Sequence, residues 1–311
     1  FLVKLFVKKV NMKRKIVKQG EATLMVSLPS KWAKRFNLKK GQEVNIEEID
    51  NNLVISKEDI KVKKQTKINL TNLTESSIRT AIINSYRSGF DIIEVNFQDE
   101  KQYHIILHVL KNYIIGFEII KKENNACTIE NITEPSEDQF DTLFRKIFFN
   151  ISLLITNTED RLKGKIQFED YKDVVFKIHQ YDNFCRRVIS KRNLIVSKGS
   201  LIWSFLGLLI HGHRELYHLN KFLDSNKINF KDFEFYNYLK EIFNLLNEAY
   251  IKKDMSKLEK IHELEKTIIY DKFYKLIQKN NKENIALYHI VVSIRNFYLA
   301  ASPLIGIIHH V

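Results

Sequence analysis

Apolar residues in the second half of the chain recur with the period of a helix. The run FDTLFRKIFFNISLLI, starting at Phe140, puts them three or four residues apart on one broad face, which predicts a core-facing helix. Five more such segments follow, near residues 168–191, 198–223, 231–251, 255–279 and 283–308. Short connections between helices of about 20 to 28 residues favour antiparallel bundles. We therefore predict an all-α domain over 134–311, most simply two three-helix units in tandem.

The preceding residues, 58–133, have the pattern of a small α/β module in the order βαβαββ. KINL, IIEVNF, FEIIKK and ACTIENI predict strands, whereas ESSIRTAIINSYRSGF and the segment near 100–112 have helical spacing. Thr74 is the expected cap of the first helix, and Gly89 is its expected end.

Residues 12–57 alternate like β-strands around one short helix. RKIVK and TLMVSL predict two strands, SKWAKRF a helix after Pro29, and EVNIEEI and NLVISK two more strands. Gly41 is the expected turn residue, and the pair Asn51–Asn52 tolerates the positive φ of a tight hairpin. This segment has too little apolar surface for a core of its own, so we expect it to pack against something else.

Positive charge is concentrated in this first segment. The chain carries 50 Lys and Arg against 37 Asp and Glu, a formal net charge of +13, which favours DNA, RNA or an anionic membrane face as partner. A Lys-rich coding bias would account for part of it. From Met12 to Lys40 there are nine Lys or Arg and one acid, Glu21, whereas the helical half mixes both signs.

Several protein classes are disfavoured by the sequence. Cys127 and Cys185 lack CxxC spacing, so neither a disulfide framework nor a zinc site is indicated, and a reducing cytoplasm is expected. The longest apolar run, at 201–210, has half of the roughly 20 residues of a membrane span. With nine glycines and no P-loop, nucleophile elbow or Rossmann pattern, we do not expect an enzyme. We interpret FLVKLFVKKVN as an extension upstream of Met12 rather than a signal peptide.

The run LMVSLPSKWAKRFNLKKGQEVNI and its flanking strands resemble the AbrB/SpoVT family of swapped-hairpin DNA-binding modules, over about residues 12–57. The resemblance implies a β-barrel that closes only when two chains interleave, and hence a homodimer. It also implies that basic residues of the N-terminal strands and short helix face DNA: Lys13, Arg14, Lys15, Lys18, Lys31, Lys34 and Arg35. The alternative is that these cations only solvate a small dimer.

The remainder resembles the PhoU family of phosphate-uptake regulators, in the archaeal form where an AbrB-like module and an α/β segment precede the helices. The resemblance rests on IRTAIINSYRSGFDIIEVNF, IGFEI, ACTIENITEPSEDQFDTLFRKIFF and the six helical segments. It implies a cytoplasmic, DNA-binding transcriptional regulator of phosphate homeostasis. One alternative is an adaptor that binds a phosphate transporter or sensor kinase, with an N-terminal module that only dimerises. A weaker one is a structural scaffold.

PhoU proteins commonly hold multinuclear iron or zinc on E-x-x-x-D motifs of facing helices, and this sequence departs from that pattern. Glu215 is followed by Leu219 where Asp is usual, and Asp182 is followed by Cys185 where an acid is usual. Because a multinuclear site needs several converging oxygen ligands, we expect no metal or other cofactor. The weak candidates for a metal ligand are Asp182, His211 and Glu215.

Histidines cluster around Glu215 in the same predicted helix. His211 and His213 are two residues apart and so point about 200° apart, which prevents them from sharing a metal. His211 and Glu215 are one turn apart and could pair, but a solvated or core-edge ion pair is the simpler interpretation of the cluster.

Overall fold

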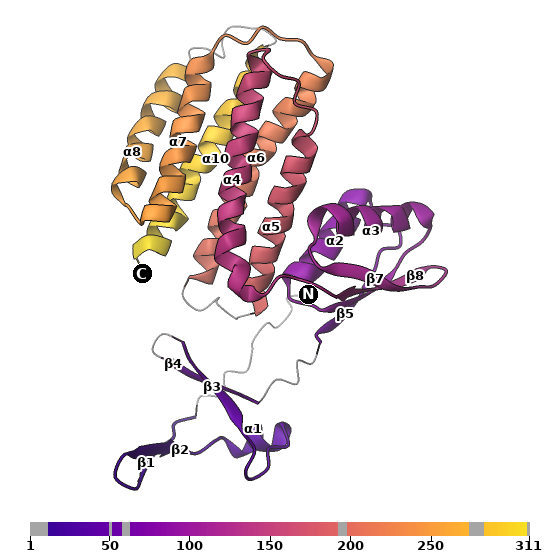
Figure 1. Ribbon diagram of the computed structural model, residues 1–311, viewed down its shortest axis with the longest axis vertical. Coiled ribbons are helices and arrows are strands. Elements are labelled where there is room, and N and C mark those ends of the chain that lie inside the picture. The colour runs from indigo at the N-terminus through magenta and orange to yellow at the C-terminus, as the bar shows by residue number, and fades with distance from the viewer. Residues whose placement is uncertain (1–11, 50–51, 58–62, 192–197, 274–282, 310–311) are drawn as a thin grey trace. The chain divides into compact units, whose positions relative to one another are not determined.

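The computed structural model describes residues 12–49, 52–57, 63–191, 198–273 and 283–309. They belong to two compact units, one ending at Val62 and the other beginning at Lys63 (Figure 1). The first is built from strands and one short helix, and the second is predominantly helical, so the chain has an α+β fold. The expected upstream extension, 1–11, and the expected hairpin residue Asn51 lie outside the described residues.

Two antiparallel hairpins and one helix form the first unit, as the sequence predicts. The elements are β1 (Ile16–Gln19), β2 (Thr23–Val26), α1 (Ser30–Arg35), β3 (Val44–Ile49) and β4 (Asn52–Lys57). β1 pairs with β2, and β3 pairs with β4. Gly41 has φ +86°, which confirms it as a turn residue because side chains with a Cβ rarely adopt that conformation.

The second unit begins with a four-stranded sheet in the order β5-β6-β8-β7. Its elements are β5 (Gln65–Asn69), α2 (Glu75–Arg87), β6 (Ile92–Asn96), α3 (Glu100–Tyr113), β7 (Phe117–Lys122) and β8 (Ala126–Asn131), which confirms the predicted βαβαββ order. β5 and β6 are parallel and the other pairs antiparallel. The side chain of Thr74 accepts a hydrogen bond from the N–H of Ser77, and Gly89 has φ +83°, so both predicted ends of α2 are confirmed.

Both helices of this part cover the same face of the sheet (Figure 1). Ile93, Val95 and Ile129 are buried on that face. They share one apolar cluster with Ile78 of α2 and Ile106 of α3. The alternation of buried and exposed residues along β6 and β8 is that of a sheet with one covered face.

Long helices make up the rest of the second unit. They are α4 (Phe140–Leu162), α5 (Tyr171–Lys191), α6 (Gly199–Ser225), α7 (Phe233–Lys252), α8 (Ser256–Glu265) and α10 (Glu283–His309). The six predicted segments are helical, but the fifth is shorter than expected as an α-helix. It ends at Glu265 and continues as a π-helix over Lys266–Phe273, while 274–279 lie outside the described residues.

One continuous hydrophobic core runs through these six α-helices. Gly212 of α6 lets the helix approach α10 closely, because a Cβ at this position would overlap the ring of Phe297. The hydroxyl of Tyr236 in α7 donates to the carbonyl of Ile155 in α4 at 2.6 Å. The two expected three-helix units therefore share their core, and the division between them stays a prediction.

Among the described residues, one helix is long and apolar enough to cross a membrane. It is α10, and 56% of its most apolar window is buried inside the protein. Core helices of globular proteins have the same property, so the length and composition of α10 are explained by its packing against α6 and α7.

A buried arginine joins the sheet-containing part to α5. Arg187, whose side chain is 1% exposed, forms ion pairs of 2.5 Å with Asp91 and with Glu134. It also donates to the backbone carbonyl of Tyr86, at the end of α2, at 3.0 Å, and to that of Phe90, between α2 and β6, at 2.7 Å. Lys191, one turn further along α5, pairs with the same two carboxylates. Each buried charge is thus compensated, which is the condition for keeping it in the interior.

Replacing Arg187 by alanine should lower the free energy of unfolding by about 3–5 kcal/mol, because two part-buried carboxylates would lose their main partner. Denaturant unfolding followed by circular dichroism measures the change. Arg145→Ala, an exposed arginine of α4, is the matched control and should change stability by less than about 0.5 kcal/mol. Equal effects of the two substitutions would contradict the assigned role of Arg187.

The ion pairs of Arg187 should also make the free energy of unfolding depend on pH. Burial raises the pKa of Asp91, but the N–H of Lys64 and the charges of Lys191 and Arg187 outweigh burial, so its pKa is lowered overall. A carboxyl whose folded pKa is lowered stabilises the fold above its ordinary pKa of about 4, and that contribution is lost as pH falls. The free energy of unfolding of the wild type should therefore decrease below about pH 4. The decrease should be smaller in Arg187→Ala.

Candidate nucleic-acid interface

The first hairpin carries apolar side chains on both of its faces. Ile16 is opposite Val26, and Val17 is opposite Met25. Opposite residues share a face and neighbours along a strand alternate, so the two pairs lie on opposite faces. These four side chains are between 43% and 67% exposed. Neither face of the hairpin is covered by the described residues of the first unit.

The second hairpin also exposes apolar side chains, on the face that Ile46, Leu53 and Ile55 share. Ile46 lies opposite Ile55 and is 60% exposed, and Leu53 is 69% exposed. Among the residues of the first unit whose exposure the structure describes, none is buried. An isolated two-stranded hairpin is marginally stable at best in water. Covering the exposed apolar side chains of both hairpins would contribute roughly 5–10 kcal/mol per chain.

Helix α1 is held at its C-terminal end. The chain turns at Asn37, with φ +50°, and Trp32 packs against Phe36 with ring centroids 5.4 Å apart. The Lys57 ammonium donates to the carbonyl of Phe36 at 2.9 Å, which ties the end of α1 to β4. This hydrogen bond is a direct contact between the end of α1 and the second hairpin.

All seven predicted DNA-binding residues are exposed: Lys13, Arg14, Lys15, Lys18, Lys31, Lys34 and Arg35. None of them forms an ion pair with a described residue. On α1, Lys31 is three residues from Lys34 and four from Arg35, so these three cations lie on one face of the helix. Their charge is available to an external polyanion. Their role in DNA binding stays a prediction.

The structure does not bring the three weak metal candidates together. Asp182 accepts hydrogen bonds from Arg87 at 2.9 Å and from Arg186 at 2.8 Å. Glu215 lies 2.8 Å from His289 of α10. Within the described part of the chain, no three His, Cys, Asp or Glu are grouped so that they could hold a metal ion.

The sequence left open whether His211 pairs with Glu215, and the structure answers this. His211 is exposed and His213 is fully buried, in agreement with their predicted separation around the helix. The partner of Glu215 is His289 rather than His211. The sequence could not indicate His289, because the proximity of α10 to α6 is a property of the tertiary packing.

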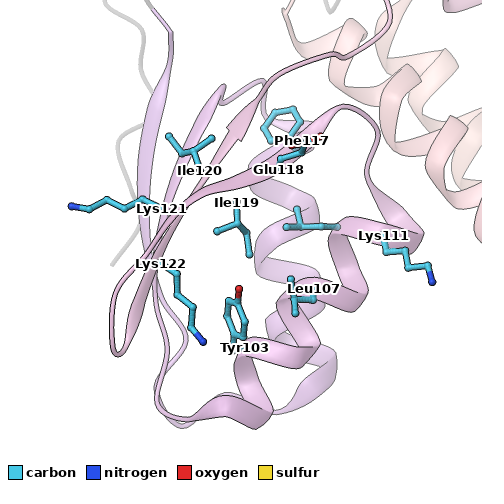
Figure 2. Close-up of a pocket in the computed structure, with 10 residues that line it drawn as sticks. Tyr103, Leu107, Lys111, Phe117, Glu118, Ile119, Ile120, Lys121 and Lys122 are labelled. Atoms are coloured by element: carbon cyan, nitrogen blue, oxygen red, sulfur yellow. The ribbon is translucent and has the colours of Figure 1, made fainter.

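A groove of about 570 Å³ lies between α3 and the edge strand β7 (Figure 2). Ile119 and Lys122 point toward α3, where the Lys122 ammonium lies 3.9 Å from the centre of the Tyr103 ring, and Lys121 points away. Glu118 is the one acid among its lining residues. Lysines on an edge strand discourage pairing with other chains, so we interpret Lys121 and Lys122 as protection of this edge.

Taken by itself, the first unit is an incomplete module. It has two hairpins with exposed apolar side chains, a set of exposed cations and, among the residues whose exposure is described, no buried one. This is the arrangement expected of an AbrB-like domain that is completed by a second chain. Residues 17–65 match the family model described as "Antidote-toxin recognition MazE, bacterial antitoxin".

The matched residues include α1, the second hairpin and most of the first, and the match supports the predicted AbrB-like module at the N-terminus. It supports a regulatory module of the DNA-binding or antitoxin type. No curated protein and no solved structure matches the chain. The predicted resemblance to PhoU concerns the residues after the matched segment and stays a prediction.

The open hairpins predict that the protein is a dimer with twice the 36.9 kDa mass of the chain. Leu24→Asp combined with Ile46→Asp should give a monomer, because the carboxylates would be buried without partners. Sedimentation equilibrium at micromolar concentration measures the mass.

Phe149→Asp is the matched control, because this residue of α4 is also apolar and is 66% exposed. It should leave the mass of the dimer unchanged. Ellipticity at 222 nm should be similar in all variants, since the long helices belong to the second unit. A wild-type protein that sediments as a monomer would contradict the interleaved arrangement.

Proposed function

We propose that the protein is a dimeric, non-enzymatic, cytoplasmic transcriptional regulator that binds DNA through its first unit and controls phosphate uptake. One observation supports DNA binding above the others. Seven exposed cations without acidic partners lie on a segment that has no core of its own. A second copy would complete the core and double the set of cations.

Phosphate contacts explain how such a surface would bind a duplex. A two-fold dimer presents the same cations twice, and each neutralised DNA phosphate releases bound counterions. Contacts to phosphates position the protein, whereas base contacts specify the sequence. We expect affinity to depend steeply on salt, with base contacts from a few residues near α1.

Control of phosphate uptake is supported by the resemblance of the remaining residues to the PhoU family. In this assignment the second unit senses a signal or a partner and changes the affinity of the first unit for DNA. Such coupling requires two conformations with different ligand affinities.

The description of the matched family favours a second candidate, in which the first unit recognises a protein as an antitoxin does. The adaptor predicted from the sequence is a third assignment, in which the helical unit binds a phosphate transporter or sensor kinase. Neither requires the seven cations to contact DNA, so a DNA-binding measurement distinguishes both from the first proposal.

Gel retardation of duplex DNA over a range of salt concentrations tests the proposal. Lys31→Ala with Arg35→Ala removes four cations per dimer and should reduce the slope of log affinity against log salt by up to about 3.6. The charge reversal, Lys31→Glu with Arg35→Glu, should abolish retardation.

Lys101→Glu with Lys177→Glu is the control, since these exposed lysines of the second unit give the same change in net charge. It should retain most of the binding. Retardation that survives the reversal of Lys31 and Arg35, or that is absent at low salt, would favour the antitoxin-like or adaptor assignment.

Selection of bound fragments from random genomic DNA tests which genes the protein regulates. Fragments upstream of phosphate-transport genes are expected to be enriched. Enrichment of unrelated promoters would contradict the role in phosphate uptake and would leave DNA binding in place.

A further inference from the structure

A fully buried histidine lies where α5 and α6 pack against each other. His213 of α6 is 0% exposed, and the centre of its ring lies 5.1 Å from that of His179 of α5, in an edge-to-face arrangement. Its Nδ1 atom is 3.3 Å from the carbonyl oxygen of Leu209, one turn earlier in α6. Its Nε2 atom has no hydrogen-bond partner among the described residues. Because a buried polar atom without a partner is costly, this ring weakens the contact in which it lies.

The end of α3 packs beside the same two rings. The ring centre of Tyr113 is 5.3 Å from that of His179. The side chain of Gln180 donates to the carbonyl of Lys111 at 2.9 Å, and that of Asn183 donates to the carbonyl of Tyr113 at 2.7 Å. His179 therefore contacts both the sheet-containing part and α6.

No acid compensates a charge on either ring. Among the described residues, neither His179 nor His213 forms an ion pair with a carboxylate. Asp182, the nearest acid to His179 in the sequence, is paired with two arginines. Glu215, the nearest to His213, is paired with His289. The charged and titratable groups that face the two rings, and the side chains of α10 beside the adjacent Gly212, are cationic or uncharged at pH 7: Arg79 and Arg87 of α2, Tyr113 of α3, His211 and Arg214 of α6, and Ser293 and Phe297 of α10.

These surroundings oppose protonation while the contact is closed. Burial is the main cause that lowers the pKa of His213, to about 3, and the hydrogen bond with Leu209 acts in the opposite direction. Burial also lowers the pKa of His179, and the charges of His213 and of nearby arginines lower it further. When the contact opens, water reaches both rings, and each regains the ordinary histidine pKa of about 6.5. The open state therefore binds more protons than the closed state below about pH 6.5.

We propose that His213 and His179 form an acid-sensitive joint, in which protonation of the buried ring separates α6 from α5 beside the end of α3. A protonated His213 would be a buried charge next to Arg214 and without an acid, which the closed contact does not tolerate. The closed contact is most stable above about pH 6.5 and loses stability progressively as the pH falls toward 3. The joint concerns only the second unit and requires no DNA, so it is independent of the proposed function.

The size of the effect follows from the two pKa values of His213. With a closed-state pKa of about 3 and an open-state pKa of about 6.5, the opening equilibrium constant should rise about fiftyfold between pH 6.5 and pH 4.5. A proton taken up by His179 would make the rise larger. The carboxyl of Asp91 acts below about pH 4, so the histidines dominate this range.

Native-state hydrogen exchange at a series of pH values, corrected for the intrinsic pH dependence of exchange, measures the opening constants of the helices. Amides near residues 176–183 of α5 and 209–216 of α6 should show the rise. Amides of α7 should show a much smaller one, because this helix packs against α4, α8 and α10.

His213→Asn removes the titratable ring and keeps a donor to the carbonyl of Leu209. Asparagines elsewhere in these helices donate to the carbonyl four residues earlier, as Asn150, Asn220 and Asn296 do at 2.7, 2.9 and 2.9 Å, so the variant is expected to fold. Its opening constant should rise at least about tenfold less than that of the wild type over the same range. His213→Gln is a second neutral replacement with the same expected result.

His104→Asn is the matched control, because His104 is an exposed histidine of α3. It should show the wild-type rise. An equal rise in His213→Asn and the wild type, an equal rise in α7, or a wild-type rise of less than about fivefold would overturn the role assigned to His213.

Discussion

A β-hairpin with apolar side chains on both faces must be covered on both faces before it is stable in water. The first unit has two open hairpins, a helix of six residues and no buried residue among those whose exposure is described. A second copy is the economical cover, because closed two-fold dimers are the commonest protein assemblies. The same constraint bears on function, since any two-fold pairing would present the seven cations twice.

The second unit differs from the first, because it has a continuous apolar core and several buried charged side chains. Arg187 and Asp182, both on α5, connect that helix to the sheet-containing part through buried ion pairs. Buried ion pairs add little net stability, but removing one partner is costly. We interpret them as contacts that fix how α2 lies on α5.

Much of the fold could be predicted because hydrophobic periodicity and turn residues are local signals. The alternation in TLMVSL, the spacing in FDTLFRKIFF and the position of Gly41 each predicted an element or turn that the structure contains. The partners of charged side chains are not a local signal. By sequence alone Asp182 is a candidate metal ligand, and nothing marks Arg187, because neither of its partners, Asp91 and Glu134, is near it in the sequence.

The sequence by itself determined which segments become strands and helices, where positive charge is concentrated and which segment lacks a core. Only the tertiary structure decided which charges are buried, which are paired and which are left without a partner. Arg187 and Asp91 are 96 residues apart, and His289 is 74 residues from Glu215. The physical reason is that periodicity reports the environment of one element, whereas a pair of charges depends on how two elements pack against each other.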